Sequence, residues 1–518
     1  MRSTTTALVI AGLLATVSSI AVRAADPPSD GLSQLAITPT ASLAQATIPA
    51  QPNGTAISPG AGSGTSDSVS GISRNPANNT SGSVFLHGLS QPNSVAVPTS
   101  GLFPEFGVSL LDDGIDLHGI AFDRFLGNPT AGIVPGNDYN LGVLSPAADF
   151  DLQRILGIHG AAVHVDVTFF GLRSNIPTIA TETGGFLTGV QTTPAPSTTP
   201  FAVSIFTYDQ KLLNDKLSIE VGRTNPFRYF ALPNSLDPAT YFSSVLEVNG
   251  DLASPRFPTW GGLVSYRFTP LWAVQGGAFG DNFYRDEYNP QDLGEVRASG
   301  VQTFASLEYR SEFTNAAYPA NAELGLEWNT RHGPSNVEGA PIYYNGRNAA
   351  TDYHGGGVIF MQGEKVIWRG ARGRQGPPPN IAIYGQLDAA VDKPVPFDFD
   401  TLAGVNFTGL IPGRPFDALG AQVHYQRMSA LEANFETRLR NIFAGPGPRQ
   451  PRDGYGFELI ANIHVLPWLQ FRPFAEAFIN PDSYYDAAQK YRARNGFEFG
   501  FLGVIPIGQL LGTSTKPY

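Results

Sequence analysis

Apolar and polar side chains alternate strictly along many short segments of this chain, and this pattern constrains its fold more than any other feature. Residues 162–171 read A-V-H-V-D-V-T-F-F-G. In an extended strand the valines and Phe169 would share one face, and His164, Asp166 and Thr168 would share the other. In a soluble sandwich the apolar face points to a core, whereas in a membrane barrel it points to lipid and the polar face lines a lumen. The alternation alone leaves both folds open.

The same alternation recurs from about residue 101 to near the C-terminus. It is found at 201–208, 217–221, 301–310, 321–329, 381–388, 403–407, 434–440, 456–464 and 497–502. Turn signals such as Thr269-Pro270 and Leu466-Pro467-Trp468 separate neighbouring segments, as in antiparallel strands with short connections. The 57 Gly and 42 Pro disfavour helices, while the 34 Phe and 19 Tyr suit sheets. We therefore predict an all-β fold with one large β-domain over residues 101–518.

The N-terminus has the order of a cleaved secretory signal. Arg2 precedes an apolar run over residues 7–22, and Ala24 and Ala25 are small residues suited to cleavage, which predicts a signal peptide over 1–24. Residues 25–100 consist mostly of Ser, Thr, Ala, Pro, Gly and Asn. We expect this low-complexity segment to be disordered, because it cannot bury enough apolar surface to offset its ordering entropy.

The chain is acidic and contains no cysteine. Its formal net charge is −11, and loss of Arg2 and Arg23 with the signal would make it −13. This charge argues against a nucleic-acid partner, which requires a basic face. The absence of cysteine excludes disulfides and thiolate metal sites. An exported chain of this length must then be held together by its own hydrogen-bonded framework.

Five blocks of sequence carry a resemblance to a known family. They are 149–171, 211–223, 357–368, 404–417 and 467–481, and G-L-I-P-G-R-P at 409–415 is the most specific piece. In this order they resemble the carbohydrate-selective porins of Gram-negative outer membranes, the OprB-type family, over most of 101–505. Two departures stand beside the likeness. Phe416 replaces an acidic residue of the family, and G-Q-L-L-G-T-S-T-K-P-Y follows the last strand, which in the family usually ends the chain.

The resemblance implies a closed antiparallel transmembrane β-barrel in the outer membrane of a Gram-negative bacterium. Closure is also required physically, because an open sheet edge in hydrocarbon would leave backbone N–H and C=O groups unpaired. About sixteen strands leave an aqueous channel. The valine face of 162–171 would then point to lipid. The implied function is passive, carbohydrate-selective diffusion of small sugars such as glucose, by a monomer or homotrimer without a cofactor.

A sugar channel should present planar hydrogen-bonding groups that bind weakly enough for release. Residues 301–310 and 434–440, taken as strands, each place such groups on one face. The candidate substrate-binding or pore-lining residues are Arg223, Gln302, Glu308, Arg310, Glu323, Glu327, Arg414, Asp417, Glu436, Arg438 and Glu458. Three of them, Arg223, Arg414 and Asp417, follow only from their place in the family-like blocks. For these a structural role in bracing a turn is the open alternative.

No catalytic or metal-binding motif is found, and we expect neither an enzyme nor a metal site. Glu323 and Glu327 are separated by about 13 Å along one strand. This exceeds the roughly 5–9.5 Å that glycoside hydrolysis requires. Two alternative functions stay open. One is a general or cation-preferring porin for small solutes, and the other is a secreted soluble β-protein that binds or processes polysaccharide and needs no detergent.

Overall fold

The fold is seen in a computed structural model, in which the described residues form a β-barrel and its accompanying helices. The structure describes residues 101–174, 201–224, 226, 229–230, 258–281, 293, 300–313, 315–334, 352–371, 378–391, 397–483 and 491–514. The predicted signal peptide (1–24) and low-complexity segment (25–100) lie outside these residues. Their boundaries stay predictions.

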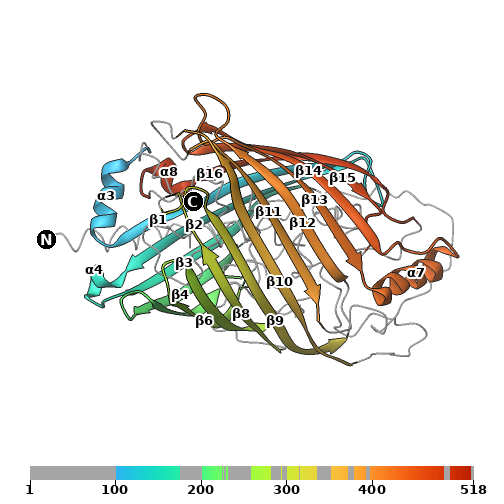
Figure 1. Ribbon diagram of the computed structural model, residues 1–518, viewed down its shortest axis with the longest axis horizontal. Helices are drawn as coiled ribbons and strands as arrows, with labels where there is room; N and C mark the ends of the chain where they lie inside the picture. Colours follow the sequence, from blue (N-terminus) through green and yellow to red (C-terminus); the bar gives the residue numbers. More distant parts are fainter. Residues whose placement is uncertain are drawn as a thin grey trace, which may run out of the picture. The chain divides into compact units, whose positions relative to one another are not determined.

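Sixteen strands form the wall of the barrel (Figure 1). They are β1 (Ile115–Asn128), β2 (Asn137–Asp151), β3 (Ala161–Ser174), β4 (Phe201–Leu212), β5 (Leu217–Thr224), β6 (Thr259–Arg267), β7 (Trp272–Asp281), β8 (Gly300–Arg310), β9 (Ala320–Pro334), β10 (Asp352–Arg369), β11 (Asn380–Ala390), β12 (Phe397–Thr408), β13 (Ala418–Met428), β14 (Asp453–Leu466), β15 (Leu469–Ile479) and β16 (Gly496–Pro506). Every predicted strand segment lies within one of them except 434–440.

Each strand pairs antiparallel with the next along the chain, and β1 pairs with β16 to close the barrel. In this closing pair Phe125 lies opposite Phe501, and Ile120 lies opposite Pro506. A closed barrel has no free edge, so the strand backbone groups bond to one another. The predicted closed antiparallel barrel is confirmed.

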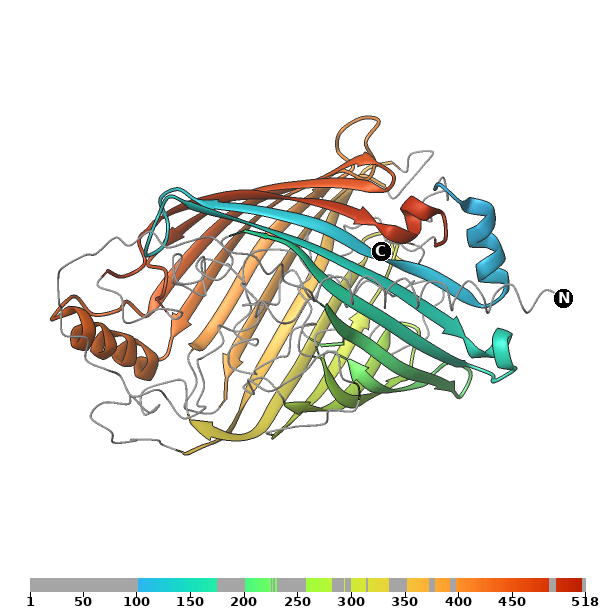
Figure 2. The ribbon, with the colours of Figure 1, turned by 180° about the vertical axis from the view of Figure 1, so that it is seen from behind.

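The two ends of the barrel differ in their connections, as Figures 1 and 2 show. Three helices lie at one end, together with short turns such as residues 213–216 and 467–468: α3 (Pro104–Asp112), α4 (Leu152–Leu156) and α8 (Ile507–Leu511). The helix α7 (Ala430–Ala444) connects β13 to β14 at the opposite end. In outer-membrane barrels short turns face the periplasm and longer loops face the exterior. By this rule α7 lies at the outer mouth.

The two faces of the wall have opposite chemistry. On β9, Leu324 is 52% exposed whereas Glu327 on the other face is fully buried. On β14, Leu459 is 65% exposed whereas Glu458 is 2% exposed. The outward residues are apolar and the inward residues polar, which is the reverse of a soluble protein and typical of a membrane barrel.

Candidate functional site in the barrel lumen

Residues 162–171 form part of β3, and their polar face lies in the lumen. His164, Asp166 and Thr168 are buried, whereas the valines between them are partly exposed on the outer face. The Nδ1 atom of His164 lies 2.7 Å from Oδ1 of Asp149 on β2. The prediction for this segment agrees with the structure, and its polar side chains hydrogen-bond to side chains of neighbouring strands such as Asp149 and Ser145 on β2.

A continuous row of inward-facing positions crosses eight neighbouring strands, each position directly opposite the next. We call this the lumen row, and it consists of Asn321, Glu364, Tyr384, Gly404, Gln422, Glu458, Glu476 and Glu498, from β9 to β16. Directly opposite residues in a sheet are close enough for their side chains to interact. The row therefore forms one connected polar surface on the lumen wall.

In the middle of the row, a tyrosine reaches across a glycine. A Cβ at Gly404 would lie 2.3 Å from the ring and hydroxyl of Tyr384, so only glycine leaves room for this ring. The Tyr384 hydroxyl then donates a 2.9 Å hydrogen bond to Oε1 of Gln422. The Nε2 group of Gln422 in turn donates to Oε2 of Glu458. This chain of hydrogen bonds orients both Gln422 and Glu458.

The row ends in carboxylates. Glu458, Glu476 and Glu498 lie opposite one another on β14, β15 and β16, and each is at most 2% exposed. The guanidinium of Arg124 on β1 interacts electrostatically with both Glu476 and Glu498. This part of the lumen is thus acidic with a basic group beside it.

A second part of the lumen wall is aromatic. Tyr229 and Phe230, which follow β5, pack against Phe279 on β7 and Phe304 on β8. The Tyr229 hydroxyl donates a 2.7 Å hydrogen bond to Glu220. Ring packing and the hydrogen bond to Glu220 therefore hold Tyr229 and Phe230 against the inner wall.

Two of the predicted carboxylates are bound near this aromatic wall. Gln275 donates to Oε1 of Glu308 over 2.7 Å and to the backbone oxygen of Tyr229 over 2.8 Å. Gln362 on β10 donates to Oε2 of Glu323 over 2.6 Å. Paired amides hold both carboxylates in place, so their orientation toward the lumen is defined.

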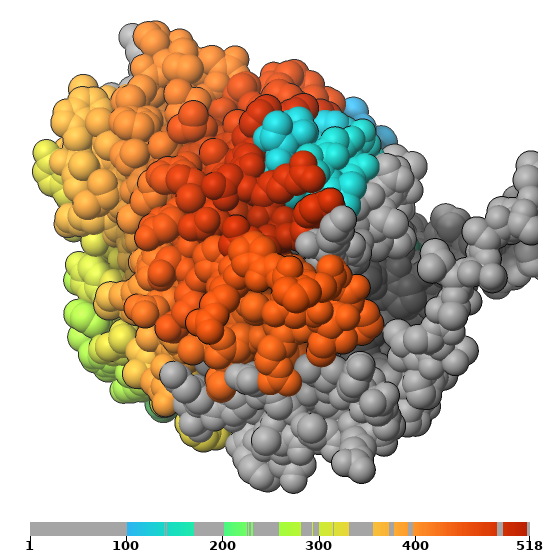
Figure 3. Space-filling model, turned by 90° about the vertical axis from the view of Figure 1, so that its right-hand side faces the viewer, coloured from blue at the N-terminus to red at the C-terminus, as the bar shows by residue number. Residues whose placement is uncertain are grey.

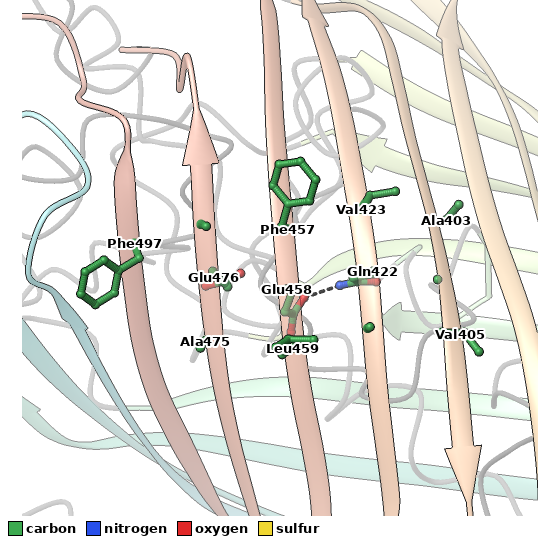
Figure 4. Close-up of a pocket in the computed structure, with 13 residues that line it drawn as sticks. Ala403, Val405, Gln422, Val423, Phe457, Glu458, Leu459, Ala475, Glu476 and Phe497 are labelled. Atoms are coloured by element: carbon green, nitrogen blue, oxygen red, sulfur yellow. Dashed lines mark hydrogen bonds between the residues drawn. The ribbon is translucent and has the colours of Figure 1, made fainter.

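Behind the acidic end of the row, the outer wall is hollowed. Figure 4 shows the outward side chains of Ala403, Val423 and Phe457 beside the inward pair of Gln422 and Glu458. Small outward residues on β12 to β15 leave a space of about 640 Å³ that is open to the outside. This hollow lies on the apolar face, so it is not part of the lumen.

The most specific family-like motif, at 409–415, forms the turn between β12 and β13. Arg414 pairs with Asp417 inside this turn and also donates a 3.0 Å hydrogen bond to the backbone oxygen of His464 on β14. Asp417 accepts from the backbone N–H of His464 over 2.9 Å. The two residues brace the turn against the neighbouring strand at the end opposite α7. For Arg414 and Asp417 these contacts support the role of bracing a turn rather than the role of lining the pore.

The prediction of an extended segment at 434–440 is wrong, because these residues are the middle of α7. Ser429 caps this helix by accepting the backbone N–H of Glu432 over 3.0 Å. Glu436 is fully buried in the helix, whereas Arg438 is exposed. The two residues therefore lie on different faces, and neither belongs to a strand of the lumen wall.

The buried face of α7 concentrates charge at the outer mouth. Glu432, Glu436 and Arg440 lie one helical turn apart, and the backbone N–H of Ser483 donates a 3.2 Å hydrogen bond to Glu436. Burial, then the charges of Glu436 and Asp482, raises the pKa of Glu432 well above its usual range. Burial and Asp482 likewise raise the pKa of Glu436, partly offset by Arg440. Figure 3 shows this end, with the orange and red surface of α7 and the β14–β16 region across its centre.

The predicted candidate residues thus fall into three groups. On inward strand faces lie Arg223, Gln302, Glu308, Arg310, Glu323, Glu327 and Glu458. Arg414 and Asp417 lie in the β12–β13 turn, and Glu436 and Arg438 lie in α7. Contact of any of them with a permeating solute stays a prediction.

Several inward polar residues were missing from the predicted set. They include Arg124, Glu220, Gln275, Glu364, Tyr384, Gln422, Glu476 and Glu498. The alternation in 497–502 already placed Glu498 on a polar face, so its position could have been found. That Glu476 lies directly opposite Glu498 depends on strand register, which a single strand sequence does not contain.

The comparison with known proteins decides the family. The model of the carbohydrate-selective porin, OprB family, matches residues 138–502. The chain belongs to the OprB family of carbohydrate-selective porins. The family predicted from the five sequence blocks is confirmed, and the chain is accordingly an outer-membrane barrel of a Gram-negative bacterium. A porin of this family is a channel, which sets aside the secreted soluble β-protein.

One solved structure with a TM-score above 0.5 supports the fold. The high-pH structure of Pseudomonas putida OprB aligns with a TM-score of 0.62 at 18% identity, covering 77% of this chain and 96% of that one. The low-pH structure of the same protein gives a TM-score of 0.46 at 15% identity, and the alignment covers 78% of this chain and 98% of that one. Salmonella typhi OmpF in complex with daunomycin gives 0.44 at 10% identity, covering 76% and 98%. No curated protein matches the chain in sequence.

Among the residues that the structure describes, no helix combines the length and the hydropathy needed to span a membrane. Within the same residues no group of three or more His, Asp or Glu side chains is arranged to hold a metal ion.

Proposed function

We propose that this porin provides a passive route across the outer membrane for small sugars such as glucose. The observation that carries the proposal is the lumen row, in which amide, phenol and carboxylate groups follow one another across eight strands. Sugars present paired hydroxyls at their edges and C–H groups on their faces. Planar polar groups of both donor and acceptor type match these edges, and weak contacts permit release.

The test is planar-bilayer conductance of the purified full-length protein while glucose is titrated. We expect stepwise channels whose current falls to a saturating level as sugar occupies the lumen. Sucrose and a charged solute of similar size serve as comparisons. Channels that conduct equally at every glucose concentration would contradict sugar selectivity and leave a general pore.

A second candidate is a cation-preferring porin for small solutes, and the acidic end of the lumen row favours it. Three adjacent glutamates there have Arg124 as a neighbouring cation. Reversal potentials in a salt gradient measure cation over anion permeability. For this candidate Glu458→Gln should lower that ratio while sugar leaves the current unchanged. Assembly as a monomer or as a homotrimer stays part of the proposal and is decided by the mass of the detergent-solubilised particle.

A further inference from the structure

Glu476 and Glu498, which we call the acid pair, differ from the other acids of the lumen row. Neither oxygen of either carboxylate has a hydrogen-bond partner in the part of the chain that the structure describes. Glu476 is 2% exposed and Glu498 is fully buried. Glu458, by contrast, accepts from Gln422.

Such an arrangement is unfavourable for the barrel alone. A buried charge is tolerated when it is paired and hydrogen-bonded, and otherwise it costs free energy. Here two like charges lie on directly opposite positions of β15 and β16, which adds repulsion. The positive charge of Arg124 offsets part of this repulsion, but Arg124 forms no hydrogen bond with the carboxylate oxygens of Glu476 or Glu498. Groups left unsatisfied in this way are typical of functional sites.

An aromatic ring lies next to the acid pair. Phe474 is two residues before Glu476 on the same face of β15, and it lies directly opposite Gly500 on β16. A Cβ at Gly500 would come within 2.3 Å of the Phe474 ring, so the ring lies across this glycine. Gly500 in turn is two residues after Glu498 on the same inward face.

We propose that Glu476 and Glu498, with the Phe474 ring beside them, form a sugar-binding subsite of the lumen. The proposal rests on the sugar-porin function proposed above and assigns its binding step to named groups. The carboxylates accept hydrogen bonds from neighbouring hydroxyls of a pyranose, and the aromatic ring packs against its C–H groups. The guanidinium of Arg124 offsets part of the negative charge of the pair, and the ligand itself is uncharged.

The experiment compares glucose affinity, from the block of single-channel current, with thermal stability in detergent. We expect Glu476→Gln and Glu498→Gln each to weaken glucose binding about tenfold or more, because a charged acceptor is lost. Both variants should also unfold at a higher temperature than the unaltered protein, because an unpaired buried charge is removed. Glu105→Gln is the control: it removes one exposed carboxylate on α3, outside the barrel wall, and should change neither quantity.

The other possible results distinguish failure of the subsite from failure of the proposed sugar-porin function. If the unaltered channel ignores glucose, the proposed function fails. If it binds glucose and the Gln variants bind it equally well, the subsite fails while the function stands. Variants that lose both affinity and stability would assign the acid pair a structural role, and a changed cation permeability with unchanged glucose affinity would make it a cation site. Glu476→Asp, which keeps the charge and withdraws the oxygens by one methylene, should bind glucose with intermediate affinity even if a Gln variant does not fold.

Discussion

The lumen wall contains glycines whose missing side chain makes room for a ring, and Gly404 is one of them. Its Cβ position lies 2.3 Å from the Tyr384 ring and hydroxyl, atoms that cannot move without losing the bond to Gln422. We expect Gly404→Ala to displace this ring and to lower the free energy of unfolding by about 1–3 kcal/mol, as overpacking does. The midpoint of urea unfolding in lipid vesicles measures this.

Two variants separate the packing from the hydrogen bond. Gly503→Ala adds the same methyl group on β16, where no atom lies within 4 Å, and should leave the midpoint nearly unchanged. Tyr384→Phe keeps the ring and removes the hydroxyl, at a cost of about 1 kcal/mol. Equal midpoints for the Gly404 and Gly503 variants would show that the Tyr384 ring is not held by this close approach.

At the scale of secondary structure, the strands could be predicted from sequence and α7 could not be told apart from them. Over residues 434–440 a period of two and a helical period both give plausible polar faces. The deciding signal lay outside this window, in Ser429 and Glu432, which form the S-x-x-E pattern that begins a helix. The prediction of strands, by contrast, rested on many segments with the same alternation of apolar and polar residues. The error at 434–440 therefore did not change the predicted barrel fold.

The candidate site was predictable to a more limited extent. Alternation along one strand assigns its polar face, which is why Glu323, Glu327 and Glu458 were found on the inward side. Which polar groups meet depends on the register between strands, and whether their oxygens are bound depends on side-chain positions. The pairing of Gln422 with Glu458 and the unpaired state of Glu476 follow only from three-dimensional coordinates.

The packing of α7 should depend on pH. The buried face of the helix contains Glu432, Glu436 and Arg440, facing Asp482, and the raised pKa values of both glutamates mean that the packed helix holds their protons to higher pH than the released helix does. Packing is therefore strongest below the ordinary carboxyl pKa of 4.5 and weakens as the pH rises through the raised values. We expect hydrogen-exchange protection of the α7 amides to fall over a pH range that begins near the ordinary carboxyl pKa of 4.5 and extends upward.

A variant with a neutral side chain at position 436 tests whether the buried glutamates cause this pH dependence. Glu436→Gln removes one of the two coupled charges, so protection of α7 at the upper end of this pH range should rise about tenfold for each unit of pKa shift removed. Glu105→Gln changes an exposed carboxylate of α3 at the other end of the barrel and should leave the α7 profile as it was. An unaltered profile in the Glu436 variant would place the pH dependence elsewhere.

At the scale of the whole barrel, the seam between the first and last strands is reinforced by the segment that follows β16. Backbone N–H groups of Leu102 and Phe103 donate to the oxygens of Leu510 and Leu511 over 2.8 and 2.7 Å. The Thr513 hydroxyl donates a 2.8 Å hydrogen bond to the backbone oxygen of Leu117 at the start of β1. The tail that distinguishes this chain from the usual family pattern thus joins residues before and within β1 to the end of β16.

Truncation distinguishes a structural clasp from a dispensable extension. A chain ending at Pro506 keeps the β1–β16 pairing but loses these three hydrogen bonds, and we expect its free energy of unfolding to fall by a few kcal/mol, at about 1 kcal/mol for each bond. A chain ending at Ser514 keeps all of them and should match the full-length protein. Refolding from urea into detergent micelles, with no cellular assembly machinery present, makes the comparison one of intrinsic stability. Equal stability of the two truncated chains would mean that the β1–β16 ladder alone closes the barrel, and that α8 contributes nothing to the seam.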